Sequence, residues 1–151
     1  MSHDFRVVPA AYVFLRRGED VLLQLRDGTG FMDGHWAAAA AGHVEADESV
    51  FEAACREALE ELGVRIDPAD LRPLTAMHRT QASHKPVDER VDFFFECWAW
   101  NGEPHLVETE KAADLGWFSL DALPHPVVQH ERVVLDGMHA GHIDPIVTFG
   151  F

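Results

Sequence analysis

Apolar segments along the chain, separated by short polar turns, predict a series of β-strands. The first two, RVVPAAYVFL at 6–15 and VLLQLR at 21–26, are joined by the polar turn RRGED. Segments of the same character predict further strands at 71–79, 90–100 and 115–120. Aromatic residues dominate the segment RVDFFFECWAW at 90–100, which makes it the strongest strand prediction.

A helix with defined ends is predicted at about 49–62. Ser49 and Glu52 match a capping box at its start, and Gly63 is a suitable stop at its end. At 100° per residue its apolar side chains fall on one broad arc that must face the core: Phe51, Ala54, Cys55, Ala58, Leu59 and Leu62. A second, mostly helical segment is expected after Pro126.

The segment HWAAAAAGHVE at 35–45 is ambiguous between helix and strand. Its five alanines favour a helix, but no capping residue opens the run and Gly42 closes it. We interpret it as a short buried strand that follows a glycine-rich loop at 27–34. Strands interleaved with helices predict an α/β fold, a sandwich around a mixed β-sheet, formed by residues 1–151 as one domain.

Composition and charge exclude several classes of function. The formal net charge of −14 argues against a groove for duplex nucleic acid, which needs basic stripes. No run approaches the roughly 20 apolar residues of a membrane span, and MSHDFRVVPA lacks the features of a secretory signal. Cys55 and Cys97 are expected to be buried thiols in a cytoplasmic protein without a membrane partner.

Three carboxylates are concentrated on the predicted first helix. Glu57, Glu60 and Glu61 lie opposite the apolar arc, and no Lys or Arg follows them at i+4 within the predicted helix. Glu45 and Glu48 add further acid at the helix entrance. The arrangement is open to two interpretations, a solvated acidic face or an oxygen-rich site for a hard divalent cation such as Mg²⁺.

The spacing of these residues resembles a known family motif. Gly42, five residues, Glu48, seven residues and then REALEELGV at 56–64 are similar to the Nudix box, Gx5Ex7REUxEExGU, where U is aliphatic. The chain around this box (42–64) also resembles a Nudix domain, whose fold is an α/β/α sandwich. Gly42, Glu48 and Gly63 would be structural positions of the box.

The resemblance implies hydrolysis of a nucleoside diphosphate linked to another group, with Mg²⁺ or Mn²⁺ as cofactor. Glu57, Glu60 and Glu61 would bind the metal together with the backbone carbonyl of Ala41. Arg56 would hold a box carboxylate through a paired, directional contact. The run AAAAAGH departs here from the Leu-Pro-Gly-Gly-like turn of many relatives, which bears on the path of the chain at Ala41.

The general base is expected either in the box or on a later loop. Glu57 is the first choice within the box. The loop segment ETEK offers Glu108 and Glu110, and the resemblance favours Glu110. Each of these carboxylates could also be a solvated charge.

Substrate contacts are predicted from two positions near the glycine-rich loop. Arg26 ends a strand there and would contact phosphate, and Trp36 would stack on a base, as could Phe31 or Phe95. Core packing is the alternative for these aromatic residues. The apolar segment HIDPIVTFGF at 142–151 is expected to dock on the domain or on a second subunit of a homodimer.

These observations predict a (d)NTP pyrophosphohydrolase that acts on a small nucleotide, oxidised nucleotides included, and releases a nucleoside monophosphate and pyrophosphate. A hydrolase of a nucleotide sugar or another nucleoside diphosphate derivative is the alternative within the same class. A Nudix-fold module that binds nucleotides without cleaving them is the alternative outside it.

Overall fold

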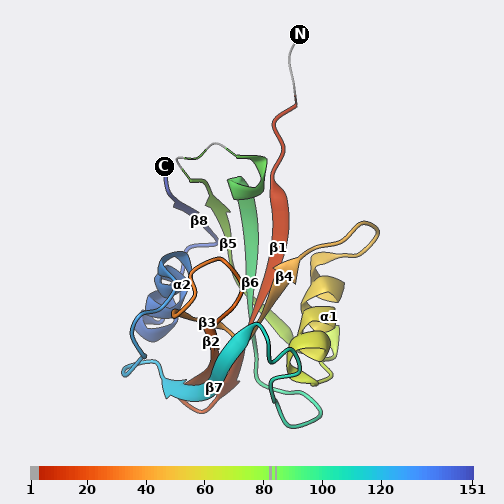
Figure 1. The fold of residues 1–151 in the computed structure, drawn as a ribbon, viewed down its shortest axis with the longest axis vertical. Coiled ribbons are helices and arrows are strands. Elements are labelled where there is room, and N and C mark those ends of the chain that lie inside the picture. The colour runs from red at the N-terminus through yellow and green to blue at the C-terminus, as the bar shows by residue number, and fades with distance from the viewer. Residues whose placement is uncertain (1–3, 82, 84) are drawn as a thin grey trace.

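A mixed β-sheet lies between two helices in the computed structural model, which describes residues 4–81, 83 and 85–151 (Figure 1). The helices are α1 (Val50–Leu62) and α2 (Gln129–Ala140), with short 3₁₀ turns at Pro68–Asp70 and Pro86–Asp88. The strands are β1 (Val8–Arg17), β2 (Asp20–Arg26), β3 (Trp36–Ala38), β4 (Ala40–His43), β5 (Leu71–Arg79), β6 (Arg90–Cys97), β7 (Ala112–Ser119) and β8 (Ile146–Phe149).

The sheet is mixed, as the sequence predicts. Its main path runs β3-β2-β1-β6-β5-β8, while β4 pairs with β1 and β7 pairs with β2. The pairs β1–β6 and β5–β8 are parallel, and the other pairs are antiparallel. The long parallel contact between β1 and β6 brings Arg90, at the start of β6, beside Val8.

Strand β1 is buried on both faces and divides the core between the two helices. Its successive side chains point to opposite faces, so one set packs with α1 and the next with α2. The α1-side cluster contains Ala11, Val13 and Leu15 with Ala54, Ala58 and Leu62. The α2-side cluster contains Ala10, Tyr12 and Phe14 with Val134 and Leu135. This packing confirms the α/β/α sandwich.

Helix α1 has the ends that the sequence predicts. The Ser49 side chain accepts a hydrogen bond from the Glu52 backbone N–H, and the Glu52 carboxylate accepts one from the Ser49 N–H, both at 3.1 Å. Gly63 ends the helix in the left-handed conformation with φ 69°. An N-cap of this kind stabilises a helix by about 1 kcal/mol.

The prediction of a single strand at 35–45 is wrong, because the chain changes its pairing strand within this segment. Trp36–Ala38 pairs with β2, whereas Ala40–His43 pairs with β1. An unbroken run of small residues carries no signal for such a switch. The late strand also begins at Ala112 rather than at 115, and β6 ends at Cys97, before the two tryptophans that follow.

The C-terminal segment docks on the domain itself. Strand β8 pairs in parallel with β5, with Ala76 to Arg79 opposite Ile146 to Phe149. Val147 and Phe149 pack against the α2-side cluster, while Ile146 is exposed. Within the described ranges, neither helix is long and apolar enough to cross a membrane.

Candidate active site

The end of β4 and the middle of α1 meet at Gly42 and Glu57. A Cβ atom at position 42 would lie 2.2 Å from the Glu57 Oε1, so only glycine leaves room for this carboxylate. Burial raises the pKa of Glu57, and the neighbouring Arg56 guanidinium partly offsets the shift. The contact therefore holds the Glu57 carboxylate at the junction between β4 and α1.

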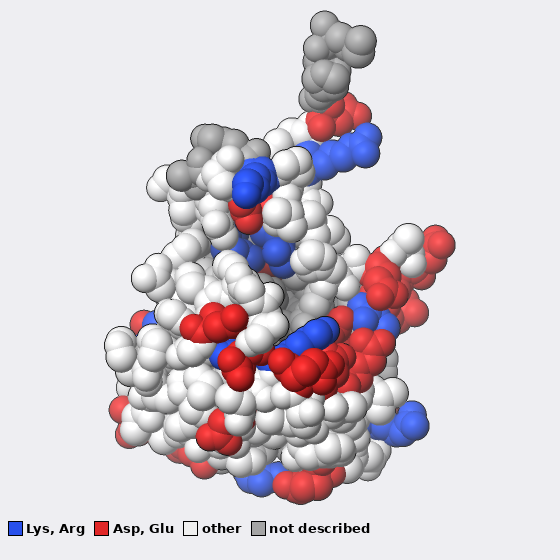
Figure 2. Space-filling model, in the orientation of Figure 1, with Lys and Arg blue, Asp and Glu red and all other residues white. Residues whose placement is uncertain are grey.

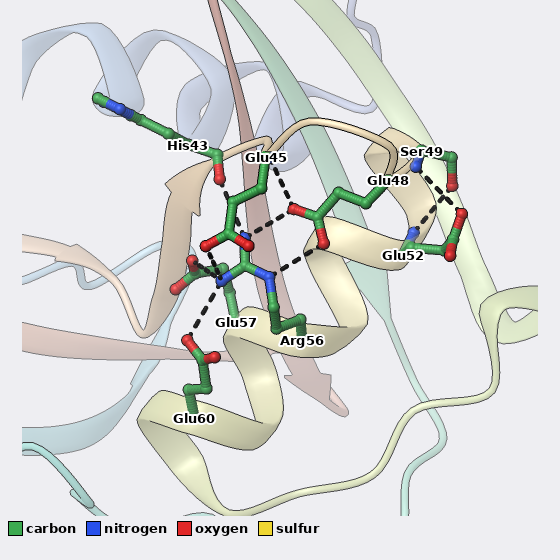
Figure 3. Close-up of polar contacts among 8 residues, drawn as sticks. All are labelled: His43, Glu45, Glu48, Ser49, Glu52, Arg56, Glu57 and Glu60. Carbon is green, nitrogen blue, oxygen red and sulfur yellow. Dashed lines mark hydrogen bonds and ion pairs between the residues drawn. The ribbon is translucent and has the colours of Figure 1, made fainter.

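Arg56 lies at the centre of the acidic group (Figure 3). Its Nε and Nη2 donate to the two Glu48 oxygens at 3.0 and 2.8 Å, a paired contact of the kind predicted. Nη1 donates to Glu57 at 2.7 Å and to Glu60 at 3.2 Å, and Nη2 also donates to the His43 carbonyl at 3.0 Å. One guanidinium thus joins the loop after β4 to two turns of α1.

Glu48 is a structural member of this group. Hydrogen bonds from Arg56 hold its pKa below the ordinary value. One of its oxygens also accepts from the Glu45 backbone N–H at 2.8 Å, which closes the turn ahead of α1. The structural role that the motif assigns to Glu48 stays a prediction, which these contacts support.

Glu61 is the most deeply placed of the three helix carboxylates. Its Oε2 accepts a hydrogen bond from the Ala41 backbone N–H at 2.7 Å. Its pKa is raised to about 8, chiefly by burial and also by the charges of Glu57 and Glu108, while the Ala41 hydrogen bond lowers it. The side chain therefore retains a proton at neutral pH when no cation is near.

The loop before β7 brings a fourth carboxylate to the helix. The Val107 N–H donates to the Glu61 carbonyl at 3.1 Å and ties this loop to the end of α1. The charge of Glu108 raises the pKa of both Glu57 and Glu61, and Lys111 contacts Glu108 at 3.0 Å. The exposed Glu110 instead has its backbone carbonyl against Gly28. Of the two loop acids, the structure brings Glu108 to the box.

A cavity of about 400 Å³ adjoins these carboxylates, and Ala41 and Gly42 form part of its wall. Figure 2 shows it as a hollow with a red acidic rim on one side and blue basic side chains inside. Further polar side chains of its wall come from the middle of β1, the end of β5, the start of β6 and the start of α2: Tyr12, Arg79, Arg90, His130 and Glu131. The cavity is large enough for a small ligand.

Sequence and structure comparisons assign this architecture to a family. A model of the NUDIX domain matches residues 6–138, which is most of the chain. The chain belongs to the Nudix hydrolase family. It is 34% identical over 119 residues to a protein named NAD-capped RNA hydrolase NudC from Chromobacterium violaceum. The match covers 79% of this chain but 40% of that protein, so the chain spans about two fifths of this relative's length.

Solved structures of Nudix proteins have the same arrangement of elements. A MutT NUDIX hydrolase from Burkholderia pseudomallei superposes with a TM-score of 0.78 at 29% identity, over 87% of this chain and 97% of that chain. A UDP-X diphosphatase superposes with a TM-score of 0.67 at 22% identity, over 97% of this chain and 69% of that chain, and this likeness shows the fold alone.

The carboxylates of this Nudix box fit a hard divalent cation. Across residues 4–81, 83 and 85–151, no three His, Cys, Asp or Glu side chains already converge as a metal cage. However, the charge of Glu108 raises the pKa of Glu57 and of Glu61, and the charge of Glu57 raises the pKa of Glu61. All three carboxylates offer oxygen ligands. A cation between them would relieve this repulsion. Glu60 is half exposed and, like Glu57, accepts a hydrogen bond from Arg56, so its predicted part in metal binding stays a prediction.

Of the two residues predicted to contact substrate, Arg26 lines the cavity and Trp36 does not. Arg26 does line the cavity, where its Nε donates to the Phe31 carbonyl at 2.8 Å and its Nη2 donates to the Thr29 hydroxyl. Trp36 does not line it. The Trp36 ring packs edge-on against Phe118 at 4.8 Å, on the α2 side of the core. Trp36 thus has the core packing that the sequence left as its alternative, and Phe31 and Tyr12 are aromatic residues that line the cavity.

Sequence reasoning missed the polar wall of the cavity. Arg79, Arg90 and Glu131 were not identified as site residues, because two stand at the polar ends of strand segments and the third lies in the polar start of α2, QHER. Asp92 does carry a signal, since it is a charge within the apolar run RVDFFF and its side chain is fully buried in β6. That charge inside an apolar pattern was the available indication.

Proposed function

We propose that this chain hydrolyses a phosphoanhydride bond in a nucleoside diphosphate linked to another group, with Mg²⁺ or Mn²⁺ as cofactor. The observation that carries the proposal is the position of Glu57 and Glu61, two partly or largely buried carboxylates with raised pKa values beside a 400 Å³ cavity. Buried, like-charged acids with perturbed pKa values cluster at functional sites.

Each residue of the box then has a chemical role. Glu57, Glu61 and Glu108, with the Ala41 segment beside them, would hold the cation, which supplies charge neutralisation at the phosphate oxygens and a more acidic water. Arg56 keeps the Glu57 carboxylate oriented and ties it to the loop through Glu48. Glu57 or the loop acid accepts a proton from the attacking water. Gly42 leaves the space in which the Glu57 carboxylate lies.

A nucleoside triphosphate is the first candidate substrate. Attack of water on phosphorus would release a nucleoside monophosphate and pyrophosphate. This choice rests on the family resemblance of the box. The MutT NUDIX hydrolase from B. pseudomallei, of which this chain covers 97%, supports the hydrolase class. Phe31 and Arg26 at the mouth of the cavity would contact the nucleoside and a phosphate, respectively.

A dinucleotide such as NAD, or an NAD-capped RNA end, is the second candidate substrate. The name of the C. violaceum relative supports it, at 34% identity. In that case the products would be two mononucleotides, one of them at the RNA end, and no pyrophosphate would form. A nucleotide sugar and a non-catalytic binding module are the remaining alternatives.

A product assay on a substrate panel tests the proposal. The panel contains dNTPs, an oxidised dNTP, NAD, an NAD-capped RNA and UDP-sugars, each with Mg²⁺, with Mn²⁺ and with excess EDTA. We expect turnover that depends on the metal, and pyrophosphate as the product identifies the triphosphate reaction. Binding without cleavage of any member would establish the binding module instead, and full turnover in EDTA would exclude the metal role.

A further inference from the structure

Two arginines face each other at the inner wall of the cavity. Arg79 is the last residue of β5 and Arg90 the first of β6, and they are direct partners in the antiparallel ladder. Both line the cavity, and Arg79 is 3% exposed. Like charges directly opposite on neighbouring strands destabilise a sheet unless another group compensates them.

The protein supplies only part of that compensation. Arg79 Nε donates to Asp92 Oδ2 at 2.7 Å, whereas Arg90 Nη2 is 3.8 Å from Asp92 Oδ1. Arg90 Nε and Asp92 Oδ1 are buried and have no hydrogen-bond partner in the described part of the chain. Asp88, which also lines the cavity, is partly buried and accepts a hydrogen bond from the Ser83 hydroxyl. One buried carboxylate therefore serves two guanidinium groups.

The remaining neighbours neutralise little of this charge below pH 7. Burial raises the pKa of Glu131 to about 7, so this carboxyl carries less than half a negative charge below that pH. His130 is held neutral, because burial and then the charges of Arg79, Arg90 and Arg26 lower its pKa to about 3. Its Nε2 lies 3.3 Å from the Tyr12 hydroxyl. The wall is rich in donors and positively charged, in a chain whose formal net charge is −14.

We propose that Arg79 and Arg90 form a subsite for a phosphate group on the part of the substrate remote from the Nudix helix. Guanidinium groups bind phosphate through paired, charge-assisted hydrogen bonds, and the unpartnered Arg90 Nε is such a donor. The acidic rim repels a free phosphate when no metal is present, which favours binding at the arginine-lined wall of the cavity.

This inference rests on the proposed function for its choice of substrate class. The substrate would be a nucleoside diphosphate derivative with a second phosphate away from the bond that is cleaved, for example on a ribose hydroxyl. A hydrolase for plain triphosphates has all its phosphates at the metal and needs no such subsite. Binding of the anion itself, however, requires neither metal nor turnover.

Calorimetric titration with inorganic phosphate in excess EDTA tests the subsite directly. We expect the wild type to bind phosphate and Arg90→Gln to bind it about ten- to a hundredfold more weakly, the usual range for losing a charged hydrogen-bond donor. Arg90→Lys keeps the charge without the planar fork and should fall between them. Arg132→Gln is the matched control, since Arg132 lies half exposed on α2, away from the cavity lining, and pairs with Asp136 at 2.9 Å.

Thermal melts of all four proteins establish that each variant is folded. If the wild type binds no phosphate, or if Arg90→Gln binds it as tightly as wild type, the subsite is overturned. Arg79 is kept unchanged, because its loss would leave Asp92 buried without its close partner.

A matched pair of dinucleotides then identifies the source of the phosphate. With Mg²⁺, we expect kcat/KM for NADP, which carries a ribose phosphate, to exceed that for NAD at least tenfold, and Arg90→Gln to bring the ratio close to one. A ratio of one in the wild type would mean that the subsite takes free phosphate, which overturns its role in substrate binding. Absence of all hydrolysis with intact phosphate binding would count against the proposed function alone.

Discussion

Glu57 and Glu60 differ in their surroundings although they are three residues apart on one helix. Glu57 lies against Gly42 and is half buried, so its pKa is raised. Glu60 is half exposed and pairs with Arg56 at 3.2 Å. The acidic face of α1 is therefore not uniform, and the chemically useful carboxylates are those nearest β4 and the loop before β7.

Replacement of single carboxylates should identify the general base. If Glu57 accepts the proton of the attacking water, Glu57→Gln should lower kcat by about 10²–10⁴-fold with little change in KM, because that contact strengthens in the transition state. Glu108→Gln should show the same pattern if the loop acid is the base, and steady-state kinetics at saturating Mg²⁺ distinguish the two.

Glu110→Gln and Glu103→Gln complete this series. Glu110 is the loop acid favoured by the family resemblance, and the structure leaves it exposed. A large kcat loss in Glu110→Gln alone would restore it as the base. Glu103 is an exposed loop residue and serves as the control. Equal, small effects in all four variants would mean that the acidic group is only solvated.

His130 and Glu131 should influence stability in opposite directions as the pH changes. Burial raises the Glu131 pKa from its ordinary 4.5 to about 7, so the folded state keeps a proton that the unfolded chain loses. Its contribution to stability therefore falls as the pH rises from about 4.5 to 7. Burial lowers the His130 pKa from 6.5 to about 3, so its contribution falls as the pH falls below 6.5.

Glu131→Gln should remove the Glu131 contribution to the pH dependence of stability. The amide keeps an acceptor for the Ala38 N–H, which now donates to Glu131 at 2.7 Å, and has no proton to lose. Urea unfolding at pH 4.5 and pH 8 should show the variant gaining up to about 3 kcal/mol relative to wild type over that interval. An unchanged difference between the two proteins at both pH values would contradict the buried, protonated carboxyl. Glu103→Gln is again the exposed control.

At the scale of elements, the contact between β4 and α1 sets the position of the Nudix box. Strand β4 pairs with β1 and so is fixed in the sheet, while α1 is fixed by its caps and by the α1-side core. The two elements approach most closely where Gly42 faces Glu57. A side chain at position 42 would therefore act on the site without touching substrate.

Gly42→Ala should displace the Glu57 carboxylate. The new Cβ would clash with Oε1, the flexible end of the side chain, so the carboxylate must move away from Arg56. Loss of that charged hydrogen bond should cost about 1–3 kcal/mol in unfolding free energy, together with a loss of kcat. A double-mutant cycle with Glu57→Ala supplies the control. In that background Gly42→Ala should cost less than about 0.5 kcal/mol, because the clashing group is gone. An equal cost in both backgrounds would refute the steric explanation.

At the scale of the whole molecule, the sheet joins the C-terminal segment to the cavity. Strand β8 covers the edge of β5, and the Phe149 ring lies 6.2 Å from the His130 ring in an edge-on arrangement. His130 in turn lines the cavity. A segment far from the Nudix box in sequence thus supports the polar wall of the site.

Phe149→Ala should be more destabilising than Ile146→Ala. Phe149 packs against the α2-side cluster, whereas Ile146 is 71% exposed on the same short strand. Loss of the partly buried ring should reduce the unfolding free energy by about 1–3 kcal/mol, and the Ile146 variant should stay within about 0.5 kcal/mol of wild type. Chemical denaturation measures both. Similar losses for the two variants would show that β8 is held by its backbone pairing alone.

The sequence by itself determined the local elements and the box. The capping residues Ser49 and Glu52, the stop at Gly63 and the apolar arc between them are encoded within 15 consecutive residues, so their periodicity could be read directly. The strands 71–79 and 90–100 carry equally local patterns. The same holds for the motif from Gly42 to Val64, whose spacing identified the family before any contact was known.

Only the tertiary structure decided which of these residues meet. The switch of partner between Ala38 and Ala40, the proximity of Glu108 rather than Glu110, and the core position of Trp36 all depend on contacts between distant segments. Arg79 and Arg90 face each other because β5 and β6 pair in a particular register. Burial and pairing between distant strands are properties of the assembled sheet, and no local pattern encodes them.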